Sequence, residues 1–229
     1  MRRSEERLVH ILRRLVEVDP GGGAARLCDL SAEVVAVTGA GIMLMSTHTA
    51  GPGTLCASNP VSALIEDLQF TLGEGPCVDA YREDRVITEP DLADPIQLRW
   101  SALGPHMVEA GARALFGFPL RVGAIRLGAL NLYSDRPGPL SDDQHADALT
   151  MAYVAARVVL GQVPNATDLF SESGADFHLI VHQAAGMVSI QLGASLAESL
   201  VRLRAHAFSH EATVDAVAEA VVGRRLRFD

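Results

Sequence analysis

The sequence contains no lysine. All nineteen basic residues are arginines, and twenty-eight acidic residues outnumber them. The resulting formal charge of −9 argues against a chain that binds nucleic acid over its whole surface, because such binding depends on neutralising phosphates with basic side chains. A local cluster of arginines remains compatible with nucleic-acid binding.

Cysteine is scarce as well. The 229-residue chain has three, Cys28, Cys56 and Cys77, and no two of them form a CxxC pair. An odd number without paired spacing is not typical of a disulfide framework. We therefore expect reduced thiols and a cytoplasmic protein.

One long segment lacks charge altogether. Residues 177–197 contain no Asp, Glu, Lys or Arg, and a segment of that length is long enough to cross a bilayer. However, polar residues are spread through it, and His178, His182, Ala185 and Ser189 recur at the spacing of one helix face. The pattern predicts an amphipathic helix with an uncharged polar face and no membrane span. The N-terminal residues, interrupted by charges, predict neither a signal peptide nor a span.

The first two thirds of the chain mix helix and strand patterns. With 48% hydrophobic residues, the chain has enough apolar side chains for a sizeable core. Two apolar runs flank a Gly-Pro-Gly turn at 51–53, and two longer runs flank Gly123, which predicts two antiparallel hairpins. Helices are expected at 4–18, 24–38, 60–70, 101–109 and 141–163, the last capped by Ser141, and a further strand is expected at 85–88.

The last third predicts helices alone. Residues 164–174 are polar and contain Pro and Gly, which is typical of a linker. Ser195 and Glu198 form the pattern of a capping box at the start of the second of three helices. The expected fold class is α+β, an antiparallel sheet with flanking helices, followed by a small all-α domain. The expected segments are an N-terminal helix (1–20), an α+β domain that ends in a long helix (21–163), a linker (164–174) and a helical domain (175–229).

Two sets of residues carry a resemblance to known families. TLGEGPCVDAYREDRVITEPDL (71–92) and GFPLRVGAIRLGALNLY (117–133) resemble a GAF domain of the actinobacterial type. Residues 175–229 resemble an ANTAR domain, a three-helix RNA-binding module of transcription antiterminators. The matching residues are Gln183-Ala184, Gly186-Met187, Gly193, Ser195, Leu203-Arg204, Ala207, Val217-Ala218 and Val221.

The combined resemblance implies a cytoplasmic, non-enzymatic regulator of transcription antitermination. Its GAF domain would sense a small molecule or a partner protein, and its ANTAR domain would bind tandem RNA stem-loops. The resemblance also implies a homodimer, for which the apolar stripes of helices 4–18 and 141–163 are suited. Many ANTAR domains carry a basic residue where this chain has Ala185. We expect Ala185 on the polar face of the first ANTAR helix, so this chain would lack a charge at that position.

Arginines are the expected RNA contacts, because guanidinium groups bind phosphate and stack on loop bases. Residues 178–229 contain five arginines and five acidic residues, so the charge of −9 lies entirely in residues 1–177. Solvation of helix ends is an alternative role for these arginines. The candidate RNA-binding residues are His182, Gln183, Arg202, Arg204, Arg224, Arg225 and Arg227.

The ligand of the sensor domain is not named by the sequence. Without lysine, the residue set linked with cyclic-nucleotide GAF domains is incomplete, and neither a cofactor nor a metal is expected. The pairs His178/His182 and His206/His210 lack a carboxylate or Cys at ligand spacing. The candidate ligand-lining residues, each of which fits a core role equally well, are Met43, Cys56, Phe70, Cys77, Tyr81, Trp100, Phe116 and Phe118.

Two other functions remain open at this point. The chain could be a protein-interaction scaffold that has lost RNA binding, for which the uncharged Ala185 is the best support. It could also be a cysteine-dependent reductase of free methionine sulfoxide, since some GAF-fold proteins have that activity. The three cysteines, spaced 28 and 21 residues apart, do not obviously match that family.

Overall fold

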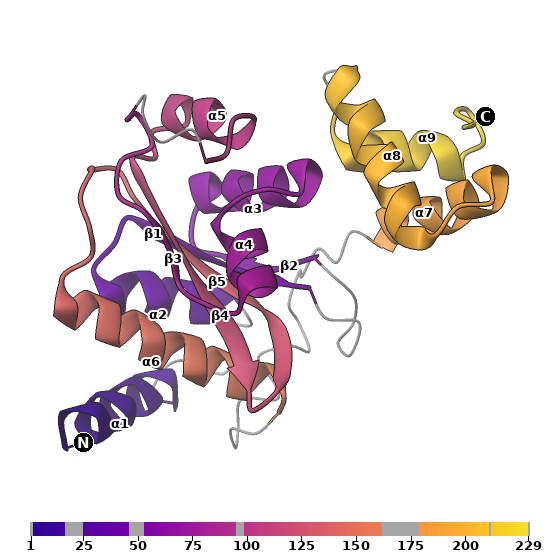
Figure 1. The fold of residues 1–229 in the computed structure, drawn as a ribbon. Helices are drawn as coiled ribbons and strands as arrows, with labels where there is room; N and C mark the ends of the chain where they lie inside the picture. The colour runs from indigo at the N-terminus through magenta and orange to yellow at the C-terminus, as the bar shows by residue number, and fades with distance from the viewer. Residues whose placement is uncertain are drawn as a thin grey trace.

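The computed structural model describes residues 2–16, 25–45, 53–94, 99–161, 179–210 and 212–228. These residues form an α+β domain, up to residue 161, and a helical module from residue 179 (Figure 1). The linker expected at 164–174 lies outside the described residues. The elements of the α+β domain are α1 (Arg2–Val16), α2 (Ala25–Val35), β1 (Gly39–Leu44), β2 (Gly53–Ala57), α3 (Pro60–Leu72), α4 (Pro76–Glu83), β3 (Ile87–Glu89), α5 (Leu103–Glu109), β4 (Ala114–Val122), β5 (Ile125–Ser134) and α6 (Asp142–Val159).

A five-stranded antiparallel sheet in the order β2-β1-β5-β4-β3 forms the centre of the α+β domain. The two predicted hairpins are confirmed as β1–β2 and β4–β5. The predicted strand at 85–88 is shifted, since β3 begins at Ile87. Pairing of β1 with β5 joins the two hairpins into one sheet, and the sequence could not show this because the two strands are far apart along the chain.

Helices cover both faces of the sheet (Figure 1). On one face α2 packs on β1 and α6 packs on β4, while α1 packs against the outside of α6. On the other face α3 packs on β1 and β2, and α4 packs on β4 and β5. A side chain at Gly117 would collide with the backbone carbonyl of Pro76, so the glycine lets α4 lie directly on the sheet.

Local signals in the sequence explain several helix ends. Asn59 accepts a hydrogen bond from the Ser62 backbone N–H and precedes Pro60, which begins α3. Ser141 forms the predicted cap of α6, with Gln144 completing a capping box. The capping box predicted for Ser195 and Glu198 is confirmed at the start of α8. The N-terminal helix, expected at 4–18, spans Arg2–Val16, and residues 17–24 lie outside the described residues.

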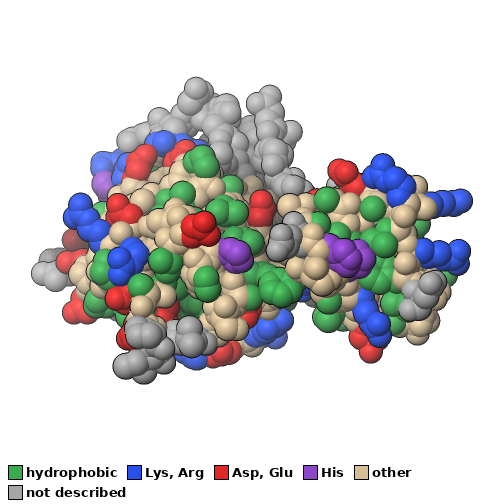
Figure 2. Space-filling model, turned by 90° about the horizontal axis from the view of Figure 1, so that it is seen from above, with side chains coloured by type: hydrophobic (Ala, Val, Ile, Leu, Met, Phe, Trp, Pro, Cys, Tyr) green, Lys and Arg blue, Asp and Glu red, His purple; other side chains and the backbone are tan. Residues whose placement is uncertain are grey.

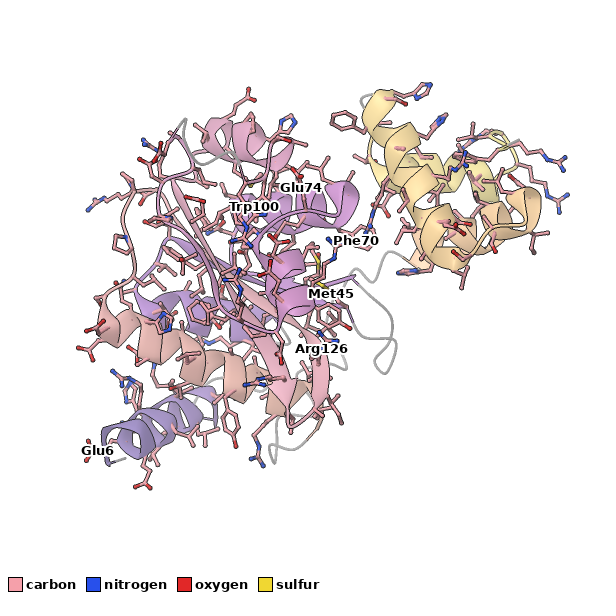
Figure 3. All side chains as sticks on the ribbon, viewed as in Figure 1. Glu6, Met45, Phe70, Glu74, Trp100 and Arg126 are labelled. Carbon is pink, nitrogen blue, oxygen red and sulfur yellow. A yellow bond between two sulfur atoms is a disulfide. The ribbon has the colours of Figure 1, made fainter. Side chains whose placement is uncertain are left out.

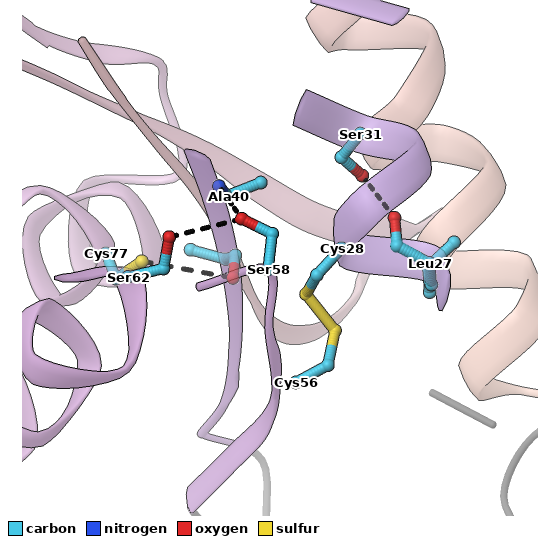
Figure 4. The surroundings of a disulfide bond; sticks show 9 residues. Leu27, Cys28, Ser31, Ala40, Cys56, Ser58, Ser62 and Cys77 are labelled. Carbon is cyan, nitrogen blue, oxygen red and sulfur yellow. Dashed lines mark hydrogen bonds between the residues drawn. A yellow bond between two sulfur atoms is a disulfide. The ribbon is translucent and has the colours of Figure 1, made fainter. Parts of the chain in front are cut away.

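The prediction of three reduced thiols is wrong for two of them. Cys28 on α2 and Cys56 on β2 form a disulfide, with their Cα atoms 6.0 Å apart (Figure 4). Cys77 is a buried free thiol. The bridge was not apparent from the sequence because it depends on α2 packing against the edge strand β2, a contact that cysteine spacing does not encode.

The helical module consists of α7 (Leu179–Leu192), α8 (Leu196–Ser209) and α9 (Val214–Val222), which all pack against one another. Val181, Ala184 and Val188 of α7 are buried, as the predicted apolar face requires. The placement of Ala185 on an exposed polar face is wrong, since it is only 3% exposed. Because α7 contacts both α8 and α9, its buried arc is wider than a single stripe and includes Ala185. A basic side chain is therefore not missing from a solvent-facing surface.

We predict that the Cys28–Cys56 bridge stabilises the α+β domain. Closing a loop between cysteines 28 residues apart restricts the unfolded chain, so Cys28→Ser/Cys56→Ser should lower the free energy of unfolding by roughly 3 kcal/mol. Urea unfolding with and without reductant measures this difference. Reductant should destabilise the parent chain and leave the double variant unchanged. Three reactive thiols, instead of one, in the denatured and unreduced parent chain would contradict the bridge.

Candidate functional site

A contact between the two domains is centred on Phe70, near the end of α3. The guanidinium carbon of Arg204, on α8, lies 5.1 Å from the centre of the Phe70 ring. The ring of His182, on α7, approaches the same phenyl ring edge-on, with centroids 6.3 Å apart. In Figure 3, Phe70 lies on the side of the α+β domain that faces the helical module. One aromatic ring thus contacts two helices of the other domain.

The end of α3 is shaped to receive Arg204. Gly73 ends the helix in the left-handed conformation, with φ of 68°, which glycine adopts without strain. A Cβ atom at this position would lie 3.1 Å from a terminal nitrogen of Arg204. Glycine therefore serves both the turn and the close approach of the guanidinium group.

A cavity of about 200 Å³ adjoins this contact. Both domains contribute to its wall, with α3 and α4 on one side and α8 on the other. Three candidate ligand-lining residues, Met43, Phe70 and Tyr81, are part of it. The full lining is Met43, Met45, Gln69, Phe70, Gly73, Val78, Tyr81, Arg82, Leu200 and Arg204. We call this space the interdomain cavity.

The charged groups that line the interdomain cavity are both positive. Burial, together with the positive charge of Arg82, lowers the pKa of Arg204 to about 10. The Nε atom of Arg204 is buried and has no hydrogen-bond partner. Gln69 is fully buried, and its Oε1 accepts a 2.8 Å bond from the Cys77 backbone N–H while its Nε2 lacks a partner.

Beneath the cavity, α3 buries an acidic side chain against the sheet. Glu66 is fully buried next to Gly41 of β1, where a Cβ atom would clash with it. Burial raises the pKa of Glu66 to about 8, although the neighbouring Asn131 side chain acts in the opposite direction. Burial also raises the pKa of the Cys77 thiol well above its usual value, and the proximity of Glu66 adds to that increase. At neutral pH this interior therefore holds a carboxylic acid and a thiol.

The remaining candidate ligand residues lie elsewhere. Phe118 is fully buried and contacts His145 of α6, with ring centroids 5.4 Å apart. Phe116 shares that face by strand alternation, opposite the α4 side to which Gly117 points. Cys56 is in the disulfide and Cys77 is in the core. The structure therefore places these four side chains away from the interdomain cavity.

Trp100 lines a second cavity, of about 420 Å³, beside α5. The indole Nε1 donates a 2.9 Å bond to Asp79. Burial raises the pKa of Glu89, whose Oε1 has no hydrogen-bond partner. Glu74 fixes the adjoining helix, because its carboxylate accepts bonds from the backbone N–H groups of Ala102 and Leu103. The lining residues are Glu89, Leu92, Trp100, Gly104, Pro105, Val108 and Glu109.

The candidate RNA-binding residues divide into two groups. His182 and Arg204 contact the α+β domain, as described above, whereas Gln183, Arg202, Arg224, Arg225 and Arg227 are exposed. Figure 2 shows basic side chains at the end of the helical module farthest from the α+β domain. The C-terminal arm that carries the last three arginines is anchored by Phe228, whose backbone N–H donates a 3.0 Å bond to Gln191 and whose ring contacts His206.

Six lining residues of the interdomain cavity were missed by the sequence reasoning, namely Met45, Gln69, Gly73, Val78, Arg82 and Leu200. Gln69, Arg82 and Leu200 carried no signal, because an arginine or leucine on an amphipathic helix is usually a surface or core residue. Met45 directly follows the buried strand β1, and this position is the one feature of the sequence that could have indicated it as a lining residue. The missing information was the contact of α8 with α3, which joins parts of the chain more than a hundred residues apart.

The described residues contain no group of three or more His, Cys, Asp or Glu side chains arranged to hold a metal ion. Within the same segments no single helix is both long enough and apolar enough to cross a membrane. Helices α7 and α8 pass such a test only as a pair, and the chain bends by 105° between them.

The five-stranded antiparallel sheet with helices on both faces defines the class of the domain as α+β. Residues 17–159 match the GAF domain family, and the chain belongs to that family. The match ends with α6 and leaves the helical module outside it. No curated protein sequence matches the chain.

Several solved structures are similar to the chain at low identity. The GAF domain of a phosphoenolpyruvate-protein phosphotransferase from Acinetobacter is 13% identical, with a TM-score of 0.48 over 68% of this chain and 92% of that one. The corresponding Coxiella burnetii domain is 13% identical, with a TM-score of 0.49 and coverages of 67% and 90%. A free methionine-R-sulfoxide reductase from Neisseria meningitidis is 16% identical, with a TM-score of 0.45 and coverages of 72% and 90%.

We predict that Glu66 makes the stability of the chain pH-dependent. The folded chain keeps this carboxyl group protonated up to about pH 8, whereas the ordinary pKa of 4.5 applies on unfolding. Stability should therefore decrease as pH rises between these values, by roughly 1.4 kcal/mol per pH unit. Glu66→Gln should remove this contribution and gain stability relative to the parent chain as pH rises. Urea unfolding at a series of pH values measures the effect.

The exposed Glu219 provides a matched control. Glu219→Gln should follow the pH dependence of the parent chain. Parallel stability curves for the parent chain and Glu66→Gln would show that Glu66 does not keep its proton in the folded state.

Proposed function

We propose that the chain is a ligand-responsive, RNA-binding transcription regulator. Its GAF domain senses a signal, and its helical module acts as an ANTAR domain that binds tandem stem-loops and prevents termination. The observation that carries this proposal is the set of exposed arginines on the helical module, Arg202, Arg224, Arg225 and Arg227. Arginine suits RNA because its planar, permanently charged group binds phosphates bidentately and stacks on unpaired bases.

The charge distribution supports the same assignment. The helical module is formally neutral within a chain of charge −9, so RNA meets far less repulsion there than at the GAF domain. Anchoring of the C-terminal arm through Phe228 holds three arginines on an ordered segment. An ordered basic segment binds RNA at a lower entropic cost than a disordered one.

Control by the GAF domain would act through Phe70. His182 and Arg204 contact this ring, and both are among the candidate RNA-binding residues. A signal that changes the stability of the interdomain contact would change how readily both side chains become available to RNA. The proposed regulator is thus a two-state system in which the GAF domain and RNA compete for the same residues.

A homodimer is part of the proposal. The apolar stripe of α1 is used within the chain, since Ile11 is buried and Arg7 forms ion pairs with Asp143 and Asp147 of α6. Val9, Leu149 and Tyr153 remain exposed on α1 and α6 by 64%, 46% and 43%. These side chains offer the apolar surface on which a second copy would pack.

We propose no enzymatic activity. A cysteine-dependent reductase needs an accessible thiolate, whereas Cys77 is buried with a raised pKa and the other two cysteines are bonded to each other. The scaffold alternative loses its main support, because Ala185 is a buried packing residue. These observations favour the RNA-binding regulator over both alternatives.

We predict that the purified protein binds RNA from a pool enriched in tandem short stem-loops. Replacing the three arginines of the C-terminal arm, Arg224→Gln/Arg225→Gln/Arg227→Gln, should weaken binding and reduce the slope of log affinity against log salt by roughly two to three. Arg202→Gln should weaken binding further. A salt series in a filter-binding assay measures both effects.

A matched charge-removal control lies on the GAF domain, in the exposed arginines Arg85→Gln/Arg121→Gln/Arg136→Gln. It should leave the salt slope unchanged, since those arginines lie outside the helical module. No binding at high micromolar protein, or equal losses in the two triple variants, would overturn the RNA-binding proposal and favour a protein-interaction scaffold.

A further inference from the structure

The polar groups of the interdomain cavity that lack partners are all hydrogen-bond donors. The Nε atom of Arg204 and the Nε2 amide of Gln69 are buried without an acceptor. Arg82 adds a second guanidinium group to the lining, and no carboxylate is among the lining residues. Buried donors that are left unpaired are costly, so this wall is complementary to a ligand that carries acceptor oxygens.

The electrostatics point to a ligand with a negative charge. Arg204 and Arg82 are close enough for the positive charge of one to lower the pKa of the other. Two like charges beside a partly buried cavity repel each other, and an anion between them would remove that repulsion. A planar guanidinium matches a carboxylate group especially well, because it can donate two parallel hydrogen bonds.

The other walls of the interdomain cavity are apolar. Two thioethers, two aromatic rings and two aliphatic side chains form them, namely Met43, Met45, Phe70, Tyr81, Val78 and Leu200. Methionine side chains adapt to ligands of irregular shape. An inorganic anion would leave these apolar surfaces unused. A ligand with both an acidic group and a compact apolar body would fill the whole cavity.

We infer that the interdomain cavity binds a small organic carboxylate, whose acidic group lies between Arg204, Arg82 and the Gln69 amide and whose apolar part contacts Met43, Phe70 and Leu200. This inference names the ligand class of the proposed sensor and rests on that proposed function. The site is shared between the domains, because Arg204 and Leu200 belong to α8. Binding therefore fixes the position of α8 against α3 and α4.

The test uses the full-length protein and a panel of monocarboxylates, from acetate to octanoate, with benzoate and phenylacetate. Each acid is compared with its neutral amide, which has a similar shape and no charge. Isothermal titration calorimetry should show at least one carboxylate that binds more tightly than its amide by roughly tenfold or more. Inorganic phosphate, titrated in parallel, should bind more weakly than that carboxylate.

Three arginine variants locate the site. Arg204→Gln and, at the exposed mouth, Arg82→Gln should each weaken binding of the selected carboxylate by roughly tenfold. Arg136→Gln, which removes an exposed charge elsewhere on the GAF domain, should bind it like the parent chain. The inference is overturned if no carboxylate binds more tightly than its amide, or if both cavity variants bind as the parent chain does. Phosphate affinity equal to that of the carboxylate would overturn the organic-acid assignment.

The RNA assay separates this inference from the proposed function. Carboxylate binding without RNA binding would leave the site in place and contradict the RNA-binding proposal. RNA binding without carboxylate binding would support the RNA-binding proposal and contradict the carboxylate site.

Discussion

The placement of Arg204 on Phe70 is the interaction on which the relation between the two domains depends. A cation on an aromatic face gains more where water is excluded, and here the end of α3, with Gly73, makes room for the guanidinium group. The same placement leaves Arg204 without an acceptor for its Nε atom. One contact thus joins the domains and creates the unpaired donors of the interdomain cavity.

This arrangement makes sensing and RNA binding depend on shared residues. His182 and Arg204 face the GAF domain, whereas the arginines of the C-terminal arm remain exposed. In the proposed mechanism the exposed arginines supply sequence-independent affinity, while the two shared residues determine whether the module is free to engage RNA fully. A ligand in the interdomain cavity would act on that balance by differential affinity for the two domain arrangements.

Local patterns predicted the elements of the chain well, because capping residues and hairpin turns act over a few positions. Ser141, Ser195 and the turn at Gly123 are examples whose helices and strands are confirmed. Long-range contacts were not predictable in the same way. Three features depend on segments that meet only in the folded chain, namely the Cys28–Cys56 bridge, the burial of Ala185 and the contact of Arg204 with Phe70. The candidate site was therefore found in part, through Met43, Phe70, Tyr81 and Arg204.

A double-mutant cycle between Phe70 and Arg204 tests this account most directly. The free energy of unfolding would be measured for the parent chain, Phe70→Leu, Arg204→Gln and the double variant. If the guanidinium group packs on the ring as described, the two changes should be non-additive, with a coupling energy of about 0.5 to 2 kcal/mol. Strictly additive effects would show that the two side chains do not interact, and would contradict the coupling of the helical module to the GAF domain through this contact.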